Sequence, residues 1–118
     1  MNIKKLEWCD QAARALFPVL GNDAAAIEQE VSAGVSELFC VEKNSYLVTR
    51  VEGDCLIVPC FIGSHVRQVA SAIYDAAKRA GCRSVQFHTA RPGLARMLHE
   101  FGAVCVGQYY IYNVEVDA

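Results

Sequence analysis

The sequence lacks the spacings from which metal sites and disulfide frameworks are usually recognised. Its six cysteines and three histidines are scattered along 118 residues, and no C-x-x-C pair occurs. Metal-ligand spacing is therefore absent, and we expect no metal cofactor. We expect the cysteines to be reduced and to pack as small core residues.

Clustered positive charge is also missing. Lysine and arginine together number 11, against 13 acidic residues, and the formal net charge is -2. A nucleic-acid partner would require basic residues gathered on one surface, where they neutralise phosphates. The basic residues here are spread along the chain, so we expect no nucleic-acid partner.

Long hydrophobic runs do not occur either. No apolar stretch approaches the roughly 18 residues that a membrane span needs. The first residues, MNIKKLEWCDQAARAL, have a polar, acidic middle where a secretory signal has an apolar core. We therefore expect a cytoplasmic protein without a membrane partner.

Hydrophobic residues are nevertheless abundant, at 53% against 20% charged, and we expect residues 1–118 to form one packed domain.

The first part of the chain has helical periodicity. Residues 4–21 place apolar side chains at helical spacing, and we expect Pro18 together with Gly21 to stop this first helix. Asn22 or Asp23 can then cap a second helix, which ends at Gly34. Both helices are amphipathic, which is typical of helices that cover a sheet.

From Leu38 the hydrophobic period changes to two. Turn residues separate three segments, LFCVEK, SYLVTRVEG and DCLIVPCFIG, which predicts three consecutive antiparallel strands. The third strand is apolar at nearly every position, so we expect it to be central in the sheet. Pro59 lies within it, and because proline cannot donate to a strand ladder, it indicates a bulge or a neighbouring strand that has moved away.

The second half of the chain alternates helix and strand. A helix that starts near Ser64, its expected N-cap, and stops at Gly81 precedes the strand RSVQFHT, which must run parallel to the third strand. The helix GLARMLHEF and a β-rich tail, AVCVGQYYIYNVEV, follow, and Gly107 can bulge or fold this tail. The predicted fold is α+β, with a mixed central sheet flanked by helices.

This order of elements resembles the GNAT superfamily of acyl-CoA-dependent N-acyltransferases, lacking only that family's first strand. In that family the central strand and the next parallel strand splay apart around the pantetheine arm, which here implies a splay at Pro59. The pyrophosphate sits on amides at the start of the crossover helix, which are unpaired and carry a partial positive charge. The resemblance implies acetyl-CoA or another acyl-CoA as ligand, held by Cys60, Phe61, Gly63, Ser64, His65, Val66 and Arg67.

The motifs depart from the family pattern. The family's phosphate loop reads Arg/Gln-x-x-Gly-x-Gly/Ala, and its defining positions fall on Phe61, Ser64 and Val66. The family's frequent general-acid tyrosine falls on Leu98, which cannot donate a proton. In addition, FGAVCVGQYY resembles degenerate GNAT-like chains of bacteriophages. A non-catalytic role in protein contacts, possible for a phage-type protein, is therefore the alternative to an N-acyltransferase.

Acyl transfer to an amine needs a base for the amine and an acid for the thiolate. Glu37 or Glu42 is the candidate base, His88 could reach the cleft from its strand face, and Tyr109, Tyr110 or Tyr112 could supply the acid. Each has a structural alternative, namely a solvent-facing carboxylate, a packed histidine and a sheet aromatic. Cys60 with His65 would suggest a thiol nucleophile, but nothing in the sequence fixes the two side chains at hydrogen-bond distance.

Overall fold

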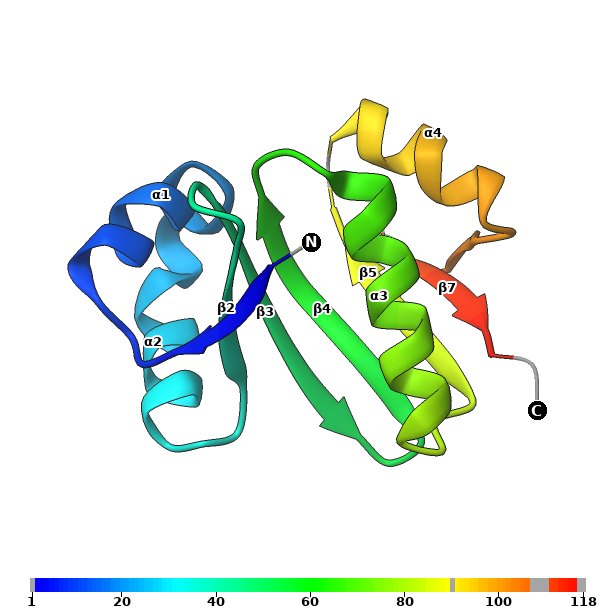
Figure 1. Ribbon diagram of the computed structural model, residues 1–118, viewed down its shortest axis with the longest axis horizontal. Helices are drawn as coiled ribbons and strands as arrows, with labels where there is room; N and C mark the ends of the chain where they lie inside the picture. The colour runs from blue at the N-terminus through cyan, green and yellow to red at the C-terminus, as the bar shows by residue number, and fades with distance from the viewer. Residues whose placement is uncertain (1, 90, 107–110, 117–118) are drawn as a thin grey trace. The chain divides into compact units, whose positions relative to one another are not determined.

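The computed structural model describes residues 2–89, 91–106 and 111–116 (Figure 1). In chain order the elements are β1 (Ile3–Leu6), α1 (Asp10–Leu20), a 3-10 helix (Gly21–Asp23), α2 (Ala24–Ser32), β2 (Glu37–Val41), β3 (Ser45–Glu52), β4 (Cys55–Ile62), α3 (Val66–Arg79), β5 (Ser84–His88), α4 (Pro92–Glu100), β6 (Val104–Val106) and β7 (Ile111–Glu115). The strands form one mixed sheet in the order β1-β2-β3-β4-β5-β7-β6. This confirms the predicted α+β class and the central position of β4.

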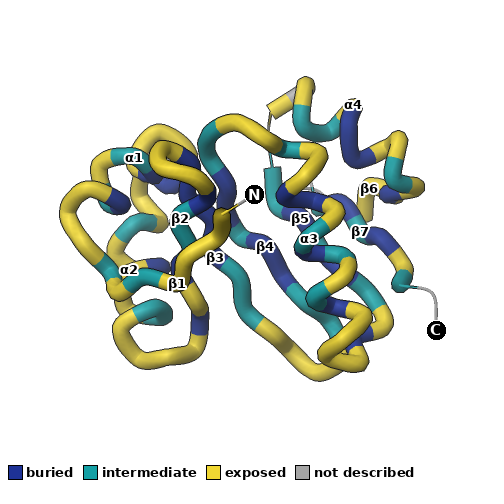
Figure 2. Tube along the Cα trace, in the orientation of Figure 1, coloured by how far each residue is buried: buried dark blue, intermediate teal, exposed yellow. Residues whose placement is uncertain are grey.

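The contacts within the fold group into two compact units. The first unit comprises Met1–Arg50 and Cys60–Ser64, and the second comprises Val51–Pro59 and His65–Ala118. The boundary falls within β3 and β4, so each of these strands contributes residues to both units. In Figure 2, β4 runs through buried and half-buried positions, whereas the turn from β3 to β4 is exposed.

The core of the first unit lies between its two helices and its strands. β1 pairs antiparallel with β2, and β2 with β3. Leu16 of α1 and Leu38 of β2 are fully buried. The buried cluster comprises Ala12, Leu16, Leu20, Ile27, Leu38, Tyr46, Val48 and Cys60. The apolar stripes of α1 and α2 therefore cover a sheet, as their periodicity predicts.

The start of the chain differs from the expectation. Residues Ile3–Leu6 form a strand against β2, so the prediction that the first strand is missing was wrong. This strand is short and mostly exposed, and its stability comes from pairing with β2, which local periodicity does not report. The helix begins only at Asp10. Pro18 lies inside its last turn, and Gly21, the other residue expected to stop the helix, is its C-cap. The helix ends at Gly21, whose φ is 49°.

The second unit contains the parallel strand pair and its crossover helix. β4 and β5 run parallel, as predicted. Along β5 the buried residues Val85 and Phe87 alternate with half-buried ones, which confirms the predicted division of its faces. The buried residues of α3 all belong to its predicted apolar stripe: Val69, Ala70, Ile73 and Ala77.

The C-terminal tail forms two strands. β6 and β7 pair antiparallel from Val104↔Asn113 to Val106↔Ile111. β7 also pairs antiparallel with β5, so it lies between β5 and β6 in the sheet. Gly107, where the sequence permits a bulge or a fold, lies outside the described residues.

Candidate cofactor site at the start of helix α3

The ladder between β4 and β5 is shorter than either strand. Its register runs from Cys55↔Ser84 to Val58↔Phe87, whereas β4 continues to Ile62 and β5 to His88. Pro59, the next residue of β4, has no N–H to donate to a ladder. Within the described residues the pairing therefore ends where the sequence predicts the opening of the two strands.

The loop after β4 depends on a glycine. Gly63 has a φ of 128°, a conformation that other residues rarely adopt. A side chain at this position would run into Ser45, because a Cβ built on Gly63 would lie 2.7 Å from the Cα of Ser45 and closer still to its hydroxyl. Glycine is thus required here for two independent reasons, its backbone angle and the close approach of β3.

Ser64 is held by the same serine. The N–H of Ser64 donates to Ser45 Oγ at 2.9 Å, and Ser45 Oγ lies 3.4 Å from the carbonyl oxygen of Ser64, to which it donates. The prediction that Ser64 caps α3 was wrong. The N-cap is His65, which has left-handed angles (φ 64°, ψ 33°), and no side chain caps this end of the helix.

The first turn of α3 presents backbone amides. The first intrahelical bond within this turn runs from the N–H of Val69 to the carbonyl of His65, at 2.9 Å. The N–H groups of Val66, Arg67 and Gln68 precede it, so the helix itself offers them no acceptor. They carry the partial positive charge of a helix start, which suits a phosphate.

Arg67 in this turn is paired with an acid of the next helix. Its guanidinium forms an ion pair with the carboxylate of Glu100, the last residue of α4, and both side chains are more than half exposed. This hydrogen bond lowers the pKa of Glu100 and raises the pKa of Arg67. Because the pKa of Glu100 is lowered on folding, the stabilising effect of the pair is present above the ordinary carboxyl pKa of 4.5 and is lost as the pH falls further.

Two of the expected cofactor residues are buried, and one of them, Cys60, belongs to the buried cluster of the first unit. The side chains of Cys60 and Phe61 are buried, at 3% and 8% exposure. Burial raises the pKa of the Cys60 thiol to about 12. At neutral pH the thiol is therefore protonated, which is the wrong state for a nucleophile.

The candidate catalytic residues occupy different surroundings. Glu37 is exposed at the start of β2, where it and Trp8 line an open hollow of about 430 Å³ in the first unit. His88 is half-buried and ends β5, one residue beyond the last pair of the β4–β5 ladder. This position places His88 at the opening of the ladder. Tyr109 lies outside the described residues.

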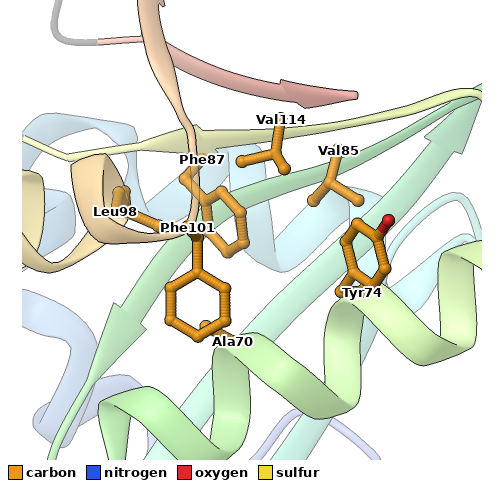
Figure 3. A pocket seen from close by; sticks show the side chains of 7 residues that line it. All are labelled: Ala70, Tyr74, Val85, Phe87, Leu98, Phe101 and Val114. Atoms are coloured by element: carbon orange, nitrogen blue, oxygen red, sulfur yellow. The ribbon is translucent and has the colours of Figure 1, made fainter. Parts of the chain in front are cut away.

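Leu98, onto which the resemblance would place the family's acid, is a core residue of the second unit. It is fully buried. Figure 3 shows side chains from α3, α4, β5 and β7 converging on a small gap of about 10 Å³, lined by Ala70, Tyr74, Val85, Phe87, Leu98, Phe101 and Val114. A gap of this size holds at most one water-sized probe. Leu98 therefore serves packing and leaves no room for a ligand.

Sequence reasoning missed Ser45 and Glu100. Each interacts with a partner that is distant in the sequence: Ser45 hydrogen-bonds to Ser64, and Glu100 forms an ion pair with Arg67.

The described residues contain no group of three or more histidine, cysteine or acidic side chains that could hold a metal ion. Nor does any helix in the described part of the chain have the length and apolar character that crossing a membrane would require.

The seven-stranded mixed sheet flanked by helices matches the fold of the GNAT N-acetyltransferases. An acetyltransferase from Bacillus subtilis in complex with CoA matches with a TM-score of 0.70 and 8% identity, over 99% of this chain and 98% of that chain. A GNAT family N-acetyltransferase from Escherichia coli, also in complex with CoA, matches with a TM-score of 0.67 and 11% identity, over 98% and 81% of the two chains.

The ribosomal-protein-S18-alanine N-acetyltransferase from Escherichia coli is similar as well, with a TM-score of 0.66 and 11% identity over 99% of this chain and 94% of that chain. The sequence matches no protein-family model and no curated protein. At these identities the likeness shows the fold, and it lends no support to the phage resemblance.

Proposed function

We propose that this protein binds an acyl-CoA and transfers the acyl group to an amine. The pyrophosphate rests on the amides of Val66, Arg67 and Gln68, and the pantetheine arm follows the strand edge that opens after Val58 and Phe87. The observation that carries the proposal is the end of the β4–β5 ladder at Val58↔Phe87. An open strand pair supplies backbone groups that a pantetheine amide can bind.

In the proposed reaction the amine nitrogen attacks the thioester carbonyl carbon, the new C–N bond forms, and the C–S bond breaks. His88 is our candidate for the base that takes the proton from the amine, because it ends β5 at the opening. Glu37, acting through water, is the second candidate for that base. Tyr109 is the candidate acid that returns a proton to the departing thiolate.

Coenzyme A and acetyl-CoA should raise the melting temperature of the protein. A ligand at a hundredfold excess over its Kd stabilises the folded state by about 2.7 kcal/mol, which corresponds to a rise of roughly 10 °C for a domain of this size. Thermal denaturation with and without ligand measures the shift, with AMP as the control for general nucleotide binding. An unchanged melting temperature in millimolar acetyl-CoA would contradict the proposal that the protein binds acyl-CoA.

A non-catalytic GNAT-fold protein with a role in protein contacts is the second candidate function. Leu98, onto which the resemblance would place the family's acid, is fully buried in the core. This burial favours the non-catalytic function. To distinguish the transferase from the non-catalytic protein, one measures the release of free CoA thiol from acetyl-CoA in the presence of primary amines. Binding without thiol release for a broad set of amines would favour the non-catalytic function.

Neutralising Glu100 should strengthen CoA binding. Glu100 competes with the pyrophosphate for Arg67, so Glu100→Gln frees the guanidinium and should improve CoA affinity about two- to fivefold, the range for an exposed pair. Calorimetric titration measures the affinity. Glu115→Gln, at an exposed acid on β7, is the matched control for the same change of charge. An equal gain in both variants would mean that net charge, and not release of Arg67, is responsible.

A further inference from the structure

We infer that the hollow of the first unit binds an alkylguanidinium cation. The hollow is open, has a volume of about 430 Å³, and lies where the end of β1, the end of α2 and the start of β2 meet. Small-molecule sites have volumes of roughly 300–1,000 Å³. All of the lining residues fall between Lys5 and Leu38, within the first unit. The inference goes beyond the proposed function, since no part of it uses acyl-CoA.

The core holds the apolar part of the hollow in place. Leu6, Trp8 and Val31 line the hollow, are half-buried, and pack against the buried cluster of the first unit. Trp8 is therefore supported by the core while part of it remains exposed. The face of an indole attracts a cation, and a guanidinium, being planar, can also stack on it. This wall suits a flat organic cation.

Two carboxylates give the hollow its charge. Glu7 and Glu37 are exposed lining residues, and each is the next residue of its chain segment beyond Leu6↔Leu38, the last pair of the β1–β2 ladder. Like charges at opposed positions repel each other. In the described part of the chain, neither carboxylate forms an ion pair. The lining also includes Lys5, so two carboxylates against one ammonium leave one negative charge for a bound cation to neutralise.

A third acid beside the hollow is already paired. Glu30 directly precedes the lining residue Val31, and Ser36 Oγ donates to Glu30 Oε1 at 2.8 Å. The guanidinium of Arg50 lies 3.2 Å from the same oxygen. Ser36 is only 2% exposed and lines the hollow, so its hydrogen bond helps to fix the wall. The carboxylates that remain for an external cation are those of Glu7 and Glu37.

The combination of an aromatic wall and paired carboxylates selects the class of ligand. A guanidinium carries five N–H donors in one plane, so it can donate to both carboxylates while its face lies against the indole. A phosphate or another anion would be repelled by the same carboxylates. The described residues contain no group of three metal-ligating side chains, so nothing in them favours a metal ion here.

The fluorescence of Trp8 tests this inference directly, because Trp8 is the only tryptophan of the chain. Titration with butylguanidinium at constant ionic strength should change the emission until it saturates, whereas butanol, with the same alkyl chain and no charge, should not change it. N-acetylarginine amide carries the same head group on an amino-acid side chain, so its affinity distinguishes a free alkylguanidine from an arginine side chain as the source. Saturation by either guanidinium compound supports the inference. Saturation by neither compound, or an equal response to butanol, overturns it.

Charge-neutralising variants locate the binding. Glu7→Gln and Glu37→Gln should each weaken the binding of butylguanidinium about two- to fivefold, the range for an exposed ion pair. Glu28→Gln is the matched control, since Glu28 is an exposed acid of α2 that does not line the hollow, and its affinity should be unchanged. The melting temperature of each variant verifies that it is folded. If Glu28→Gln lost as much affinity as Glu37→Gln, the cation would be attracted by net charge alone, and the inference would be wrong.

Discussion

Gly63→Ala should lower the free energy of unfolding by about 2–5 kcal/mol and abolish the stabilisation by coenzyme A. Backbone strain and a steric collision both destabilise the folded state of this variant. A φ of 128° is strained for any residue with a Cβ, and the new methyl group would collide with Ser45, including its backbone at 2.7 Å. We therefore expect the loop after β4, which includes the proposed cofactor residues Gly63 and Ser64, to change conformation and coenzyme A binding to be lost.

Gly34→Ala is the matched control, because Gly34 also has a positive φ, of 79°, but has open space where a Cβ would be. It should cost only the backbone part, about 1–2 kcal/mol, and leave coenzyme A binding unchanged. Urea denaturation gives both free energies, and thermal shifts with ligand give the binding. If the two variants were equally stable, the contact of Gly63 with Ser45 would not be the constraint that we describe.

Leu98→Ala should lower the free energy of unfolding by about 2–5 kcal/mol, the range for truncating a fully buried leucine. The cost combines lost apolar burial with a larger void next to the gap that Leu98 already lines. The packing around it comes from three other elements, α3, β5 and β7, so the site has little freedom to collapse.

Urea denaturation measures this loss, and Val104→Ala is the control, because Val104 is 62% exposed on β6 and its truncation should change stability by less than about 0.5 kcal/mol. Leu98→Met keeps the volume and should cost under about 1.5 kcal/mol. A loss for Leu98→Ala no larger than that for Val104→Ala would contradict the core role of this residue.

Much of the fold was predictable because local physics controls it. The turns between β2 and β3 and between β3 and β4, the alternation along β5 and the apolar stripe of α3 follow from steric preferences and side-chain period. The end of the β4–β5 ladder just before Pro59 agrees with the sequence, since proline has no N–H to donate to a ladder.

The errors occur where pairing overrides local preference. β1 is mostly exposed and too short to show a period, and it exists because β2 offers it partners from Leu38 to Val41. Pro18 lies within the last turn of α1, so it does not interrupt the earlier hydrogen bonds of the helix.

The sequence by itself determined the order of the elements from α1 to α4 and the parallel crossover, because these follow from hydrophobic period and turn residues. The tertiary structure alone decided that Ser45 holds Ser64, that Glu100 pairs with Arg67 and that Leu98 is enclosed by neighbouring elements. Those contacts join residues far apart in the chain, and their energy depends on distances that only the packed fold creates.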